Sequence, residues 1–519
     1  MPNRSTDALF QLVKSLEKSE KRNFKLYVKR NSSSEDLKIV KLFDALDKSE
    51  TYDEEQLLKK NRSIKKRQLS NMKAHLYKQI LSSLRLIKDE NNIDIQLHEQ
   101  MDYARILFNK GLYLQSLKVL DKMKEMARTN EQLTYLQQAL FFEKKIEGLF
   151  ITRSMTEKAS QLSKESDDTN SQLSLVNRLS NLSLQLYGWY ITHGHVRSQR
   201  EVEELKKFLE DNLPEETKNA QGFYERLYSY QSYCWYAFIR QDFLQYYRYT
   251  QKWADLFAEY PAMYDIETAH YIKGMHNLMG AHFDLRNAKK LQECIDEFER
   301  FSHRKVVRNN DINRILLFVY ITTARINCYF LEGNFSEGLK EVPLIEEKLK
   351  EFELYIDRHR ILVFYYKIAC LYFGAGKNEK AIQYLNKIIN WKVDLRTDLQ
   401  CYARLLHLIA HYELGNFDLL EYLTKSVYRF MAKMESLSAV EEEMFHFLRR
   451  SFQVNAHALK PEFERLLEKL KRFENNPLET RAFSYLDVIS WLESKINNVP
   501  VQDVIRQKYL KGRKKVLSE

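Results

Sequence analysis

The feature that most constrains this fold is the stretch of residues 368–389, in which one glycine separates two amphipathic segments. Small and apolar residues follow the spacing of one helix face before Gly376 and resume that spacing from Ala381. Glycine adopts a left-handed backbone conformation without the steric penalty of a Cβ, so it commonly ends a helix. The stretch therefore predicts two helices joined at Gly376. A single pair of this kind cannot bury both of its faces, so it requires similar neighbours.

Copies of the pattern occur at three other glycines, Gly111, Gly333 and Gly415. Each glycine follows a helical pattern that ends in aromatic residues, and a second helical pattern comes after it. The last three turns are spaced by 43 and 39 residues. A small residue stands at the position where the second helix of a pair would cross the first in three of the copies: Ser116, Gly338 and Ala381.

The order of small or aromatic residue, turn glycine, aromatic residue and small residue resembles the tetratricopeptide repeat. The resemblance is clear at these four places, and Leu420 departs from it at a small position. It implies an all-α fold, a right-handed α-solenoid of antiparallel helical hairpins capped by N-terminal helices. Repeats of about 39–48 residues would exceed the family's length of about 34, so we expect longer helices or looser turns. An irregular helical bundle with glycines at chance positions is the alternative.

Composition supports a helical chain with no obvious linker. Only 13 glycines and 7 prolines occur in 519 residues, which favours helix almost throughout. The five cysteines form no Cys-x-x-Cys pair, so they predict neither a disulfide framework nor a zinc site. We therefore expect a cytoplasmic protein, without a signal peptide and without a membrane span.

Less regular turns are expected between the clear copies, near Arg153, at Gly194 and at Gln241. Pro343 falls inside a second helix and should kink it. The aromatic residues between Phe223 and Trp253 have helical spacing and should lie mostly in the core.

We expect three parts along the chain. Residues 1–92 form a basic N-terminal helical bundle or cap, residues 93–498 form the helical repeats, and residues 499–519 form a terminal helix with a basic tail.

The N-terminal part contains the most one-sided charge pattern of the protein. From Gln56 to Lys88 there are ten Lys and Arg residues and no acidic residue, so this segment contributes +10 of the net charge of +11. An apolar stripe along the same helix should bind it to the core. Because phosphate contacts dominate nucleic-acid affinity, the segment is a candidate anion or nucleic-acid patch. An acidic protein partner or simple solvation are the alternatives. The candidate residues are Lys59, Lys60, Arg62, Lys65, Lys66, Arg67 and Lys73.

The tetratricopeptide resemblance also implies a binding face. In that family, the first helices of successive hairpins form a concave groove that binds extended peptides or helices. Transferred position by position, the groove residues here are Arg105, Tyr320, Asn327, Tyr366, Lys367 and Tyr402.

The sequence contains no recognisable catalytic or cofactor motif. His407 and His411 have the spacing of a helical metal pair but lack the glutamate of a zinc protease. The Glu-x-x-His pairs at Glu267 and Glu443 would lie too far apart in a solenoid to share a metal. We therefore predict no enzyme, cofactor or metal, but a scaffold that binds a protein or peptide. The alternative is a nucleic-acid-associated regulator that uses the basic N-terminal helices.

Overall fold

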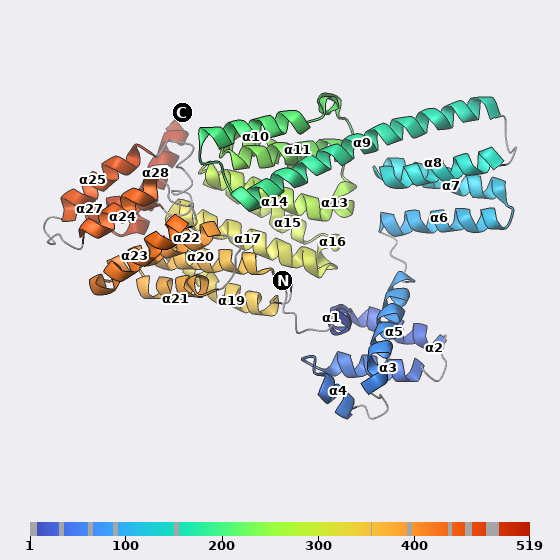
Figure 1. Ribbon diagram of the computed structural model, residues 1–519, viewed down its shortest axis with the longest axis horizontal. Helices are drawn as coiled ribbons and strands as arrows, with labels where there is room; N and C mark the ends of the chain where they lie inside the picture. Colours follow the sequence, from blue (N-terminus) through green and yellow to red (C-terminus); the bar gives the residue numbers. More distant parts are fainter. Residues whose placement is uncertain are drawn as a thin grey trace. The chain divides into compact units, whose positions relative to one another are not determined.

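The structure is a computed structural model (Figure 1) that describes residues 8–30, 36–60, 66–86, 92–149, 155–353, 355–391, 397–433, 439–451, 459–473 and 487–518. All regular elements within these ranges are helices, and no strand occurs among them. The expected all-α class is confirmed. The chain divides into two compact units, Met1–Glu99 and Gln100–Glu519, and the boundary falls inside α6 (Ile93–Asn109).

The first unit is a small helical bundle with one apolar core. Its helices are α1 (Ala8–Ser15), α2 (Lys18–Arg30), α3 (Asp36–Lys48), α4 (Glu54–Lys60) and α5 (Lys66–Arg85). The apolar stripe of α5 packs against α1, α2 and α3, with Leu76 and Ile80 fully buried. The predicted division of this helix into a core side and a basic side is confirmed for its described residues.

The second unit contains the rest of the described helices. They are α7 (Tyr113–Thr129), α8 (Leu133–Leu149), α9 (Met155–His193), α10 (Gln199–Asn212), α11 (Phe223–Ile239), α12 (Phe243–Glu259), α13 (Met263–Ile266), α14 (Thr268–Asp284), α15 (Ala288–Ser302), α16 (Lys305–Arg308), α17 (Asp311–Glu332), α18 (Phe335–Gly338), α19 (Val342–Glu351), α20 (Arg358–Gly374), α21 (Asn378–Ile389), α22 (Thr397–Glu413), α23 (Phe417–Lys433), α24 (Ala439–Ser451), α25 (Leu459–Lys471), α27 (Val488–Asn497) and α28 (Val501–Ser518). Short 3₁₀ segments cover Glu215–Asn219 and Leu339–Glu341.

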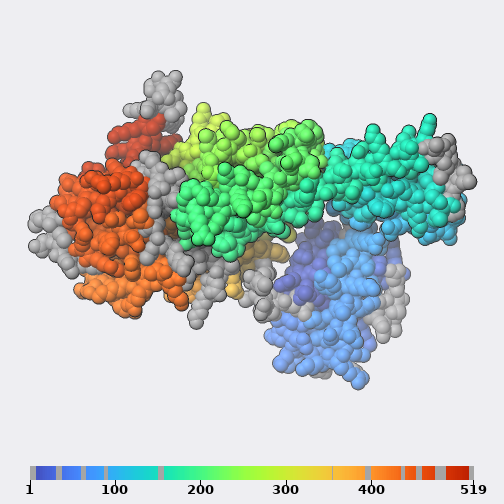
Figure 2. All heavy atoms as spheres, turned by 45° about the horizontal axis from the view of Figure 1, so that its top comes forward, coloured from blue at the N-terminus to red at the C-terminus, as the bar shows by residue number. Residues whose placement is uncertain are grey.

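Helices of the second unit pack mainly on helices that are near them in sequence. Pairs such as α11 with α12, α14 with α15 and α20 with α21 are in contact, and α14, α17 and α20 also contact one another in succession. With side chains drawn, the spaces between neighbouring ribbons are filled (Figure 2). Serial contact of this kind is compatible with a helical repeat.

The same backbone cap recurs at seven turns of the described chain. In each, a residue with φ between 54° and 76° donates its N–H to the carbonyl three residues earlier, and the next N–H bonds the carbonyl five residues earlier. This is the Schellman arrangement, which satisfies carbonyl groups left over at a helix end. The seven residues are Gly111, Glu131, Gln241, Arg286, Gly333, Gly376 and Gly415. The turns predicted at the four glycines and at Gln241 are confirmed, and Gly194 also has a positive φ of 76°.

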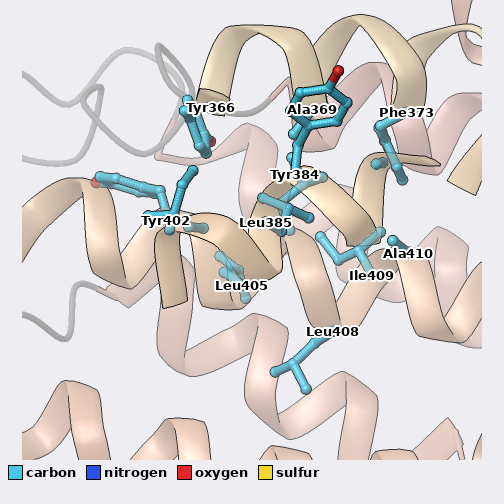
Figure 3. Packing of buried hydrophobic residues seen from close by; sticks show 14 of the residues in the cluster. Tyr366, Ala369, Phe373, Tyr384, Leu385, Tyr402, Leu405, Leu408, Ile409 and Ala410 are labelled. Atoms are coloured by element: carbon cyan, nitrogen blue, oxygen red, sulfur yellow. The ribbon is translucent and has the colours of Figure 1, made fainter. Parts of the chain in front are cut away.

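The predicted small positions lie at close helix crossings. Ser116 is fully buried, and its hydroxyl donates to the carbonyl of Ala104 at 2.7 Å. A Cβ on Gly338 would lie 2.6 Å from Leu371 Cδ2, and Ala381 is fully buried. Figure 3 shows the core around this last pair, where side chains of α20, α21 and α22 interdigitate.

Three expectations need correction or comment. Helix α9 is one continuous helix of 39 residues, where a repeat of two helices was expected. It contains no proline, and it spans two neighbours, α8 and α11. The break expected at Arg153 lies outside the described residues. Pro343 stands in the first turn of α19, after a 3₁₀ segment, so it starts a new helix where a kink within one helix was predicted.

The C-terminal helices fold back on the middle of the second unit. Trp491 Nε1 and Lys495 Nζ both donate to the carboxylate of Glu413 on α22, each at 2.7 Å. Helix α28 packs against the end of α17, where a Cβ on Gly333 would lie 2.5 Å from the backbone nitrogen of Arg506. The glycine is therefore required for close approach of α28 as well as for its left-handed φ.

Candidate functional site

Five of the six residues predicted for a groove lie on α17, α20 and α22, and Arg105 lies exposed on α6. Tyr366 and Tyr402 are buried, at 5% and 6% exposure, within the largest apolar cluster (Figure 3). Their rings therefore contribute mainly to packing in this structure, and they offer little surface to a ligand.

The other three predicted residues, Tyr320, Asn327 and Lys367, lie on the adjacent helices α17 and α20. Lys367 Nζ donates to Asn327 Oδ1 at 2.5 Å, so the structure brings this pair together across the helix contact. The Tyr320 hydroxyl accepts a hydrogen bond of 3.1 Å from Arg360 on α20. Tyr320 and Lys367 are both partly accessible.

Helix α14 adds a histidine to this group. The ring of His276 stacks on Tyr320, with a centroid distance of 3.9 Å and an interplanar angle of 12°. Burial lowers the pKa of His276 to about 3, and the nearby charges of Arg360, Lys367 and Lys273 lower it further in the same direction. The imidazole is therefore neutral at physiological pH, and three cationic side chains lie close to it.

The two lysines of this group have aromatic surroundings. Lys273 Nζ lies 5.3 Å from the ring of Tyr187 and 5.4 Å from that of Trp235, within the range of cation–π interactions. Lys367 Nζ lies 5.4 Å from the ring of Phe330 and 5.7 Å from that of Phe283. These rings hold each ammonium group while leaving its hydrogen-bonding capacity largely unused.

Negative charge does not balance this cationic group. Arg360 forms an ion pair with Asp357, but neither lysine forms an ion pair with any carboxylate in the part of the chain that the structure describes. Burial lowers the pKa of Lys367 to about 8 and also lowers that of Lys273. Burial raises the pKa of Asp284, the acid nearest to Lys367, to about 7. The group thus carries excess positive charge, which is largest below neutral pH.

We call Lys273, His276, Tyr320, Arg360 and Lys367 the cationic cluster. Of these, only Tyr320 and Lys367 were predicted from the sequence. A signal for Lys273 did exist, because it stands 13 residues before the turn residue Arg286, as Tyr320 stands 13 before Gly333. That turn has no glycine, so the repeat was not recognised there.

A separate pocket of about 430 Å³ between α8 and α9 has a different charge balance. Its lining includes Arg128, Lys164, Glu131, Glu165 and Asp168, and Arg128 forms an ion pair with Glu165. Acidic and basic groups compensate one another here, so the pocket has no excess charge with which to select a ligand.

The basic segment of the first unit is described in part. Lys59, Lys66 and Arg67 are exposed, whereas Lys73 donates to the Tyr52 hydroxyl at 2.9 Å. Arg62 and Lys65, and the side chain of Lys60, lie outside the described residues.

The aromatic block between Phe223 and Trp253 is mostly core, as expected. Both end residues are fully buried in an apolar cluster, and Tyr233 stacks on Tyr249 with centroids 4.5 Å apart. A stacking platform for bases would require several exposed rings, which this packing does not provide.

The histidine pairs have ordinary helical surroundings. The rings of His407 and His411 are 4.5 Å apart, and burial lowers the pKa of His407 to about 4. Within the described residues, no group of three or more His, Cys, Asp or Glu side chains could hold a metal ion.

Comparison of the chain with models of protein families and with curated proteins gives no match. By length and composition, α17 is one helix among the described residues that could cross a membrane. Its residues belong to both large apolar clusters of the second unit, because it packs between α14, α15 and α20. Contact on several sides explains its apolar composition within a helical core.

Proposed function

We propose that this protein is a non-catalytic scaffold that captures a segment of a partner protein. In this proposal the second unit is a right-handed α-solenoid of antiparallel, tetratricopeptide-like helix pairs, and α14, α17 and α20 are first helices that line its concave groove. The recurrent Schellman caps and the serial helix contacts support the solenoid. The absence of a disulfide among the five cysteines fits a cytoplasmic location.

The observation that carries the proposed binding function is the cationic cluster. It combines partly accessible cations and aromatic rings from three successive helices, which is the arrangement that a solenoid uses to hold an extended ligand. It contains no pair of a nucleophile and a base within hydrogen-bond reach, so nothing in it supports an enzymatic role.

Affinity purification of the full chain from its native cells, with crosslinking and mass spectrometry, tests the scaffold. We expect one partner to be crosslinked to α14, α17 or α20, and Lys367→Glu to abolish its recovery. Lys289→Glu is the matched control, because Lys289 is exposed on α15, outside the cluster. Equal recovery with both variants, or crosslinks confined to other helices, would refute the proposal.

A second candidate, nucleic-acid binding by the first unit, is favoured by the geometry of α5. Arg67, Lys78 and Arg85 are spaced by 11 and 7 residues, or roughly three and two helical turns, so they share one face. That face is opposite the buried Leu76 and Ile80. In this reading the basic face contacts phosphates and the second unit senses a ligand or partner.

Salt-dependent DNA or RNA binding tests this second candidate. For about five phosphate contacts, the logarithm of affinity should fall against the logarithm of salt with a slope of roughly −4 to −5. Replacing Arg67 and Lys78 with Glu should abolish binding, whereas the same change at the exposed Lys41 and Lys48 of α3 should leave most of it. No binding at low salt would exclude the candidate.

A further inference from the structure

The cationic cluster contains two separate positions for negative charge. Lys273 and Phe283 both belong to α14, ten residues apart, which corresponds to about 15 Å along a helix. Lys367 reaches across from α20 to within 5.7 Å of the Phe283 ring. The two ammonium groups therefore lie near opposite ends of α14, with His276 and Tyr320 between them.

Each of these positions offers a single positive charge with free valence. Lys273 is in contact with two rings, and Lys367 has one polar partner among the described residues, the amide of Asn327. An ammonium group has three N–H donors, so at least two donors at Lys367 are available to a ligand. Partly buried cations without a carboxylate are unfavourable, and a bound anion would relieve that penalty.

The third cation, Arg360, is less available than the two lysines. Its guanidinium is already bound to Asp357 and to the Tyr320 hydroxyl. A compact dianion such as phosphate is usually held by converging donors, above all by a free guanidinium fork. Two isolated ammonium groups fit two separate monoanions better.

We propose that Lys273 and Lys367 each bind a carboxylate, and that the captured protein segment carries two acidic side chains about four residues apart. An extended chain advances about 3.3–3.6 Å per residue, so four residues span the roughly 15 Å between the two positions. The segment lies across His276 and Tyr320, whose stacked rings provide a flat, uncharged surface between the two charges. This inference rests on the proposed function and specifies the chemistry of the partner.

Fluorescence anisotropy at low ionic strength, with the full chain and labelled Gly/Ser peptides, tests the spacing. One peptide carries two Glu residues four apart, a second carries two adjacent Glu residues, and a third carries Gln at both positions. We expect the spaced peptide to bind at least about tenfold more tightly than the other two. Equal affinity for the spaced and adjacent peptides, or no binding of the spaced peptide, would overturn the proposal.

Three variants test the two lysines. Lys273→Met and Lys367→Met keep an unbranched apolar stem among the rings but remove the charge, so circular dichroism should confirm that they are folded. Each should reduce the affinity of the spaced peptide to that of a peptide with one Glu, whereas Lys289→Met should not change it. Unchanged affinity in either cluster variant contradicts the assignment.

Competition separates carboxylate from phosphate recognition. Acetate and inorganic phosphate at equal ionic strength should displace the spaced peptide to a similar, small extent. Much stronger displacement by phosphate would identify a phosphate site and overturn the carboxylate assignment. If the peptides fail while a partner is still captured through Lys367, this inference falls and the scaffold stands; if the spaced peptide binds but no partner is captured, the reverse holds.

Discussion

Two glycines at the centre of the sequence pattern allow the packing and the backbone geometry to be tested separately. Gly374 is the last residue of α20, and a Cβ built on it would overlap the ring of Phe335. That ring is 5% exposed and stacks on Phe330 with centroids 5.6 Å apart, so it has little room to move. Gly376 has a φ of 74°, and its Cβ would have no atom within 4 Å. The first glycine is required for space and the second for conformation.

We expect Gly374→Ala to destabilise the second unit by about 2 kcal/mol. Overpacking against a rigid neighbour costs about 3 kcal/mol at the upper end of its usual range. Alanine in a helix regains about 1 kcal/mol relative to glycine, which leaves the net value. Gly376→Ala should cost about 1 kcal/mol, because a left-handed conformation is unfavourable for a residue with a Cβ.

Asparagine distinguishes the two causes. It tolerates the left-handed region better than alanine, so Gly376→Asn should recover most of the loss at that position. Gly374→Asn introduces a larger side chain against the same ring and should be worse than Gly374→Ala. Urea unfolding followed by far-UV circular dichroism measures all four variants. A Gly374→Ala protein more stable than the wild type, or rescue by asparagine at position 374, would refute the packing described here.

Three further predictions use the same unfolding assay. Ala381→Asp should destabilise by about 3 kcal/mol or more, because it puts a charge into a fully buried helix crossing; an unchanged midpoint would contradict that crossing. Asp284→Asn should stabilise by about 2 kcal/mol at pH 8 and hardly at all at pH 4, because burial raises the folded-state pKa to about 7 and the wild type loses stability as pH rises from about 4 to 7; a gain that is independent of pH would contradict this. Gly333→Val should release α28 from α17, because its Cβ would lie 2.5 Å from Arg506 N, and limited proteolysis should then remove the C-terminal helix before the rest; wild-type resistance would contradict this docking.

The sequence could predict helix pairs where a turn depends on one residue type. Gly376 and Gly415 have to adopt positive φ, and glycine is the residue that does so without strain, so the pattern was visible. Gln241 was found because an Asp-aromatic pair follows it. Glu131 and Arg286 adopt the same conformation with φ of 57° and 54°, and nothing in their identity indicates it. There, the surrounding helix contacts impose a conformation that the local sequence does not favour.

Candidate site residues were harder to predict than turns, because their roles depend on which helices become neighbours. Tyr366 and Lys367 are adjacent in sequence, yet one ring is 5% exposed in the core and the other side chain reaches toward α14. Position within a repeat gives the face of a helix but not how far a side chain extends from it. The aromatic block was easier, since its burial follows from apolar area alone.

The cationic cluster also shows why net charge was a poor guide to the binding face. Almost all of the net charge of +11 arises from the basic segment of the first unit, so the second unit is close to neutral overall. Its acidic residues are numerous but lie mainly in exposed pairs such as Lys290 with Glu293, which contribute little to stability or recognition. Charge in the interior acts differently, because a low dielectric strengthens every interaction that remains unpaired. Two lysines without carboxylates, Lys273 and Lys367, can therefore select a ligand more strongly than a larger number of solvated cations on a surface helix.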